Sequence, residues 1–200
     1  MYQFKDLSGL TRVAVGILWV YMISQAFFAL AIFYADVISS PPSDSSLALE
    51  GLLALIYLPA LMLSFVIVGC WIYRASANAH AVGGGLTVKP GWAVGWYFVP
   101  VANLFKPFEA MKETWLASHY GSAWGSGEAT SLLNWWWGLW IVSNIIANIS
   151  WRMGNAEPQF AAWTGLIGSV IAVPLSLILI RLIKQISEAQ RAIRQAEVFA

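Results

Sequence analysis

Four long runs without a charged residue constrain this chain more than any other feature of its sequence. They cover residues 13–35, 51–73, 132–151 and 160–180. Each is close to the 20 or so residues that a helix needs to cross a bilayer. A backbone in lipid has to satisfy its own hydrogen bonds, which a helix does within one segment. The runs therefore predict an all-α integral membrane protein with four transmembrane helices in a single membrane domain.

The composition agrees with lipid as the surrounding solvent. Only 10% of the 200 residues are charged and 59% are hydrophobic, whereas about 25% of the residues in a soluble domain are charged. The first apolar run is longer than the 7–15 residues of a signal-peptide core. We therefore interpret it as a retained first span.

The cations predict how the four helices are oriented. Four spans place residues 1–12, 74–131 and 181–200 on one side of the membrane, together with ten of the eleven Lys and Arg residues. The other side holds only Arg152. Lys and Arg are enriched in cytoplasmic loops. We therefore expect a multi-pass protein of the cell (inner) membrane with both termini in the cytoplasm.

An apolar segment between the second and third spans is too short to cross the membrane. Residues 90–105 carry no charge, and Pro100 disfavours helical structure both at its own position and at Val99. The segment 90–116 is predicted to form a broken re-entrant or interfacial helix pair, with its break at Pro100–Asn103 packed against the spans rather than facing lipid. Helical spacing also predicts one apolar stripe over Tyr97, Val101, Leu104, Phe108, Met111 and Trp115.

The two ends of the chain are predicted to be polar helical extensions. Ser8 is a candidate cap for the first helix. Residues 181–198 place Ile183, Ile186 and Ile193 near one face with charges around them. That pattern predicts a cytoplasmic amphipathic helix that lies in water or on lipid headgroups.

Three motifs resemble one known family. They are Trp71-Ile-Tyr-Arg-Ala-x-x-Asn78, then Pro90-Gly-Trp-Ala-Val-Gly-Trp-Tyr-Phe-Val-Pro100, and then Asn103-Leu-x-x-Pro107-x-x-x-Met111-x-Glu113-x-Trp115. Together they are similar to the bacterial membrane-protein family catalogued as domain of unknown function 4328. The resemblance covers roughly the whole four-span layout. It implies a topology and no activity.

Arg74 and Asn78 form the first candidate site. They lie one helical turn apart at the predicted end of the second span. An arginine there can donate two hydrogen bonds to a phosphate, with the amide beside it. The alternative is an arginine that anchors the helix end and an amide with a structural role.

The second candidate site follows the predicted break and contains Asn103, Lys106, Glu109 and Glu113. Asn103 is a candidate cap for the second half-helix. The charged residues are spaced three and four residues apart, so they either form a site for an ion or an anionic lipid or make ordinary surface ion pairs.

The sequence offers little for other chemistry. His80 and His119 lack a second ligand at metal spacing, and no nucleotide-binding glycine pattern follows a strand. We predict no cofactor, no metal and no nucleic-acid partner. The favoured function is a non-enzymatic scaffold or interaction module that contacts the bilayer, anionic headgroups, and a membrane-protein partner or a second copy. The alternatives are a small channel or transporter subunit with its site at the Pro100–Pro107 break, and a lipid-headgroup enzyme.

Overall fold

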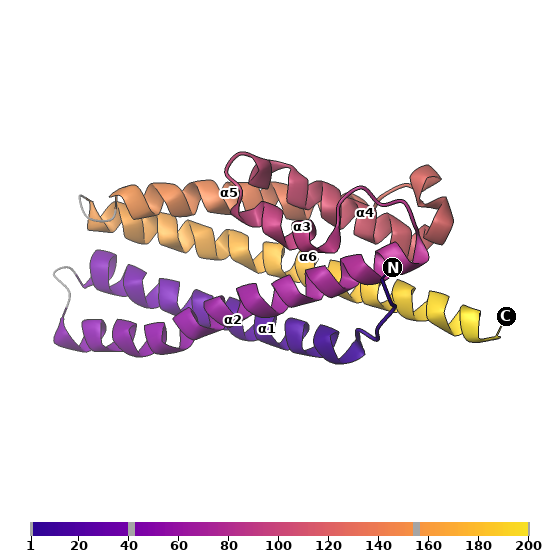
Figure 1. Ribbon diagram of the computed structural model, residues 1–200. Coiled ribbons are helices and arrows are strands. Elements are labelled where there is room, and N and C mark those ends of the chain that lie inside the picture. Colours follow the sequence, from indigo (N-terminus) through magenta and orange to yellow (C-terminus); the bar gives the residue numbers. More distant parts are fainter. Residues whose placement is uncertain (1, 40–42, 154–156, 200) are drawn as a thin grey trace. The chain divides into compact units, whose positions relative to one another are not determined.

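Helices make up the regular structure of the protein. The computed structural model describes residues 2–39, 43–153 and 157–199, and these ranges contain no strand (Figure 1). The long helices are α1 (Ser8–Phe33, continued by a π-helix over Tyr34–Ile38), α2 (Asp44–Val82), α5 (Ser131–Met153) and α6 (Pro158–Phe199). The shorter helices are α3 (Pro90–Gly95) and α4 (Lys106–Tyr120). The predicted all-α class is confirmed.

Three of the long helical stretches are long and apolar enough to cross a membrane. Within the described ranges they are Ser8–Ile38, Asp44–Val82 and Gln159–Ala196, whose apolar 18-residue windows have mean hydropathies of 2.0, 2.5 and 2.4. Helix α5 has a suitable length, but its asparagines and tryptophans lower its hydropathy. The membrane character of the chain therefore rests on α1, α2 and α6, and the crossing by α5 stays a prediction.

The long helices extend beyond the predicted spans. Helix α2 begins at Asp44 rather than at residue 51 and continues to Val82. Helix α6 continues without interruption to Phe199, so the predicted C-terminal amphipathic helix is its last part. Both helices run through an internal proline, Pro59 in α2 and Pro174 in α6. Helices α2 and α6 are therefore each longer than one membrane span, so each combines an apolar part with a polar part.

The chain divides into two compact units. Unit 1 comprises Met1–Val15, Val66–Trp137 and Leu179–Ala200, and unit 2 comprises Gly16–Phe65 and Gly138–Ile178. Helices α1, α2, α5 and α6 each contribute to both units, whereas α3 and α4 belong to unit 1 alone.

Unit 2 consists of helix segments joined by aromatic contacts. The rings of Phe28 and Tyr57 stack with centroids 4.8 Å apart, and Phe33 meets Trp163 edge-on at 4.6 Å. Large apolar side chains of the same unit lie on its surface, among them Leu55 and Phe65. A soluble protein rarely exposes so many large apolar side chains, so lipid is the natural cover for this unit.

Unit 1 has a core built around the end of α6. Leu182, Ile183 and Ile186 are fully buried there. The apolar face that the sequence placed in water or on headgroups is therefore covered by protein. The other helices of unit 1 provide that cover, since Trp71 of α2 and Ala117 of α4 are also fully buried.

The start of α1 differs from the prediction in its cap. The helix begins at Ser8, and the carboxylate of Asp6 accepts the N–H of Ser8 at 3.2 Å and also its hydroxyl. These hydrogen bonds from Ser8 hold the pKa of Asp6 below its usual range. Asp6 therefore supplies the capping oxygen, and Ser8 is the residue that it caps.

Candidate functional site

A buried pair of amide side chains lies at the centre of unit 1. Asn78 of α2 is fully buried, and its Nδ2 donates to Oε1 of Gln190 in α6 at 3.0 Å. Gln190 Nε2 in turn donates to the carbonyl of Ala75 at 2.9 Å and to the Ser118 hydroxyl of α4 at 2.8 Å. One pair of side chains therefore connects α2, α4 and α6.

The same asparagine also binds the main chain before α1. Its Oδ1 accepts the N–H of Lys5 at 2.9 Å, and its Nδ2 donates to the Lys5 carbonyl at 2.8 Å. Neighbouring contacts hold the segment as well, because Tyr2 meets the His80 ring at 5.2 Å and Leu7 is buried. The segment before α1 is thus fixed to α2 through backbone atoms.

A second set of hydrogen bonds lies about two turns away along α2. The indole of Trp71 donates to Thr11 Oγ1 at 3.1 Å and to Ser187 Oγ at 3.4 Å, and the two hydroxyls are 2.7 Å apart. Trp71 is fully buried. These contacts connect α1, α2 and α6, so both sets of bonds stabilise the same unit.

These bonds decide what Asn78 can do. A primary amide offers two donors and an acceptor oxygen, and all of these groups are engaged within the protein. Arg74, one turn earlier, is half-buried. The geometry gives Asn78 a structural role, and a phosphate contact at this boundary would rest on Arg74 rather than on the pair.

The sequence did not single out Gln190, Ser118, Thr11 or Ser187. One signal was available for Gln190, because it continues the apolar face of α6 marked by Ile183 and Ile186, and it is a polar residue there. A polar side chain on a buried face needs a partner. Its partner, Asn78, is 112 residues away in the chain, so spacing could not identify it.

The charged residues after the break make two separate sets of contacts. Lys106 Nζ and Glu109 Oε2 form the expected pair at 2.6 Å. Glu113 accepts the N–H groups of Thr87 and Val88 at 2.9 and 3.1 Å, and also the Thr87 hydroxyl. Glu113 therefore fixes the connection that leads from α2 to α3, a role that helix spacing did not predict.

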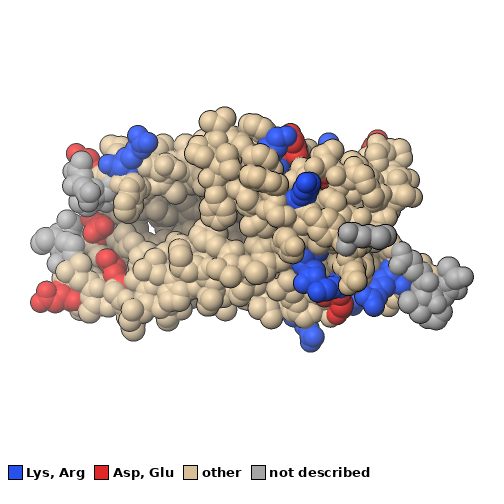
Figure 2. All heavy atoms as spheres, viewed as in Figure 1, with Lys and Arg blue, Asp and Glu red and all other residues tan. Residues whose placement is uncertain are grey.

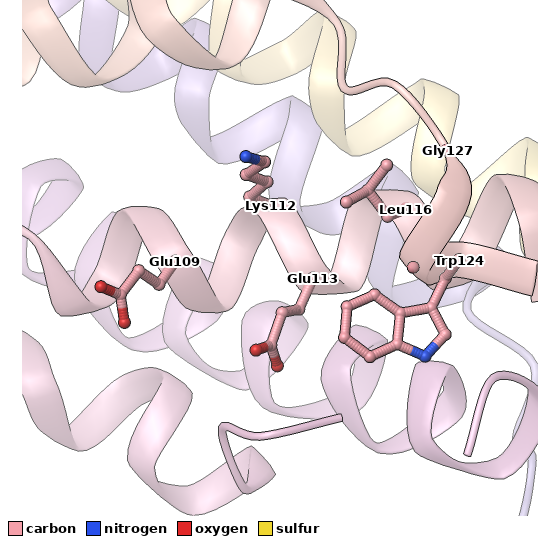
Figure 3. A pocket seen from close by; sticks show the side chains of 7 residues that line it. Glu109, Lys112, Glu113, Leu116, Trp124 and Gly127 are labelled. Carbon is pink, nitrogen blue, oxygen red and sulfur yellow. The ribbon is translucent and has the colours of Figure 1, made fainter. Parts of the chain in front are cut away.

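A shallow hollow of about 340 Å³ lies beside these acids on α4 (Figure 3). Glu109 and Glu113 extend from one side of the helix, and Lys112 extends from the other. The lining residues are Glu109, Lys112, Glu113, Leu116, Trp124, Gly125 and Gly127. Both carboxylates are already paired within the protein, so the hollow lacks free groups that converge on one point.

The break itself is a tight turn with an unusual backbone. Val101 has φ 66° and ψ −50°, and the N–H of Ala102 donates to the carbonyl of Pro100 at 2.8 Å. This is a γ-turn in its rare, strained form. Val99 is extended, as its place before Pro100 predicted.

Three expectations about the break are corrected by this turn. The helix stops there, so the predicted continuous stripe does not form: Met111 and Trp115 are buried, whereas Val101 and Leu104 are exposed. The predicted packing of the break against the spans is also incomplete, because the side chains of Val101 and Leu104 are exposed. Finally, Phe105 rather than Asn103 occupies the cap position of α4, without a side-chain cap. Asn103 is half-buried in a 3-10 turn over Ala102–Leu104.

We predict that Asn78→Ala lowers the free energy of unfolding by about 1–3 kcal/mol, since it leaves buried polar partners without a hydrogen bond. Unfolding in mixed micelles measures this. Asn148→Ala is the matched control, because Asn148 is exposed and its Nδ2 donates to the carbonyl of Asn144 one turn earlier. A loss below about 0.5 kcal/mol is expected for it. Equal effects of the two variants would contradict the role given to Asn78.

Val101→Gly is predicted to raise stability by up to about 1–3 kcal/mol, because glycine adopts positive φ without the strain of a β-branched residue. Thermal unfolding in detergent measures the change. Ala102→Gly provides the comparison, since Ala102 is not among the positive-φ residues, and it should lose about 0.5–1 kcal/mol. If both variants are destabilised alike, Val101 is not strained.

Comparison with known proteins adds one match. The family model described as domain of unknown function (DUF4328) matches residues 37–188. No curated protein and no solved structure matches the chain. The matched range includes α2 to α5 and most of α6, and with them Asn78, the break and the acids of α4. The chain belongs to the DUF4328 family.

Proposed function

We propose that this protein is a non-enzymatic membrane module whose unit 1 forms a cytoplasmic platform for anionic lipid headgroups and for a membrane-protein partner or a second copy. In this proposal α5 also crosses the membrane, as the third of four spans, and both termini are cytoplasmic. The module resides in the cell (inner) membrane.

The observation that carries the proposal is the distribution of charged residues between the two compact units. The cation-rich segments 1–12, 74–131 and 181–200 are distant in sequence, yet all of them lie in unit 1. Unit 1 holds ten of the eleven Lys and Arg residues and six of the ten acids, whereas unit 2 holds Arg152 and four acids. A positive unit and a negative unit on apolar helices support a cytoplasmic placement of unit 1.

The surface of the platform suits headgroups better than a small solute. Several Lys and Arg side chains are visible on the surface in Figure 2. Arg74 is half-buried, and the side chain of Lys106 is 36% exposed beside Glu109. An anionic surface attracts such cations by about 1 kcal/mol each. Arg74 and Lys106 are the residues that we assign to headgroup phosphates, while Asn78 and Glu113 hold the platform together.

The geometry supports a channel or transporter site at the break less well than it supports a headgroup platform. A site built on a broken helix uses free carbonyl and N–H groups at the break. Here the N–H groups of Val99, Ala102, Asn103, Leu104 and Phe105 all donate to carbonyls of the same turn or of the residues just before it. The groups that would hold an ion are therefore largely engaged with each other.

The topology predicts opposite labelling of two exposed serines. In a Cys70→Ala background, an impermeant maleimide should label Ser43→Cys from outside the cell and Ser122→Cys only in inverted vesicles. Both positions are exposed in the structure, so the reagent can reach them. Labelling of both from the same side would refute a cytoplasmic unit 1.

Headgroup binding predicts a preference for phosphatidylglycerol over phosphatidylcholine, measured by native mass spectrometry. Each cation removed should weaken the affinity about fivefold, which corresponds to roughly 1 kcal/mol. Arg74→Gln and Lys106→Gln are the test variants, and Arg152→Gln in unit 2 is the control. If all three variants bind phosphatidylglycerol equally well, the assignment of Arg74 and Lys106 is wrong.

A further inference from the structure

Four apolar side chains project from the turn between α3 and α4. They are exposed by 82, 71, 51 and 46% and belong to Phe98, Val101, Leu104 and Phe105. We call these four residues the apolar tip. The strained φ of Val101 helps to create it, because the γ-turn reverses the chain within three residues. A turn that leaves such side chains in water would lose about 25 cal/mol for each Å² of apolar surface that could be buried.

The two limbs of the tip touch span helices at positions inside the predicted spans. On the α3 limb, a Cβ added at Gly69 of α2 would lie 3.7 Å from Cγ1 of Val94. Gly69 is four residues before the predicted end of the second span, or about 6 Å along a helix. On the other limb, the indole of Trp137 in α5 donates to the Leu104 carbonyl at 2.9 Å. Trp137 is five residues inside the third predicted span, about 8 Å along its helix.

The opposite end of α4 lies outside the spans. A Cβ added at Gly83 would come within 2.8 Å of Cβ of Ala117, so α4 passes close to the part of the chain that follows α2. Charged side chains begin directly after the tip, with Lys106 paired to Glu109 and 5.8 Å from the Phe105 ring. Helix α4 thus runs from the level of the spans at Lys106 toward the polar end of unit 1.

The backbone of the turn is suited to a medium without water. Non-helical backbone does not face lipid when its polar groups are free, because each unsatisfied group costs several kcal/mol there. In this turn Ala102, Leu104 and Phe105 donate their N–H groups to carbonyls two or three residues earlier. Asn103 donates to Val99, Pro100 has no N–H to satisfy, and the N–H of Val101 makes no backbone hydrogen bond. Trp137 supplies a further donor to the turn.

We propose that the apolar tip inserts into the acyl chains of the cytoplasmic leaflet and that lipid hydrocarbon is its partner. This inference rests on the proposed cytoplasmic placement of unit 1. The hydrocarbon of one leaflet is about 15 Å thick, so a depth of 6–8 Å places the tip near the middle of that leaflet. Trp92 and Trp96 on the α3 limb, with ring centroids 4.5 Å apart, lie nearer the segment's start and suit the headgroup level.

The insertion adds a specific role to the platform. A turn held at mid-leaflet depth fixes the α3–α4 pair to the bilayer. Lys106 follows the tip directly, and its long side chain reaches from there toward the phosphates. Lipid hydrocarbon can supply no hydrogen bond, so a turn that inserts into it has to satisfy its backbone within the protein, as most of this turn does. The contacts of both limbs with helices inside the predicted spans therefore favour lipid over protein as the cover.

A spin-label experiment on the full chain tests the depth of the tip. Nitroxides are attached to Val101→Cys and, separately, to Phe98→Cys in a Cys70→Ala background. The protein is placed in vesicles of phosphatidylethanolamine and phosphatidylglycerol. Leu55→Cys, 73% exposed on α2, gives the lipid reference, and Ser122→Cys gives the water reference. Collision rates with oxygen and with a water-soluble nickel chelate are measured at each site.

The oxygen-to-nickel ratio at residues 98 and 101 is expected to exceed the ratio at residue 122 at least fivefold and to approach that at residue 55. Ratios equal to that at residue 122 would place the tip in water and overturn the proposal. Low collision rates with both reagents would mean that protein covers the tip, which also overturns it. The maleimide assay on Ser43→Cys and Ser122→Cys reports separately on the orientation of unit 1, so failure of the tip and failure of the proposed function are distinguishable.

Discussion

The buried hydrogen bonds of Asn78 are the contacts on which unit 1 depends. A single amide joins the main chain at Lys5 to α2 and to Gln190 of α6, and Gln190 extends the connection to Ser118 of α4. In a low-dielectric interior such bonds are strong when complete and costly when one partner is missing. The network therefore favours one arrangement of four chain segments over others that would bury the same apolar area.

The network also explains why polar residues occur in a chain that is mostly apolar. Apolar packing alone specifies the arrangement of helices poorly, since apolar side chains can repack in more than one way. Hydrogen bonds from Asn78, Gln190 and Trp71 add direction to that packing. The exposed cations of unit 1 are then carried on a defined surface, which a headgroup-binding platform requires.

Much of the architecture could be predicted from local patterns. Uncharged runs predict helices, and i, i+3 spacing predicts the ion pair of Lys106 with Glu109. Pro100 predicts an extended Val99. The partners of Asn78 and Glu113 could not be predicted, because they are 25 to 112 residues distant in the chain. The γ-turn was also beyond prediction, since a β-branched residue is among the least expected at positive φ.

The way in which Asn78 holds Lys5 has a consequence for variation within the family. The amide recognises the N–H and carbonyl of residue 5 and makes no use of its side chain. Docking is therefore indifferent to which amino acid, other than proline, stands at that position. The Lys5 side chain is exposed and can serve electrostatics while its main chain serves assembly, so one residue meets two requirements that can evolve independently.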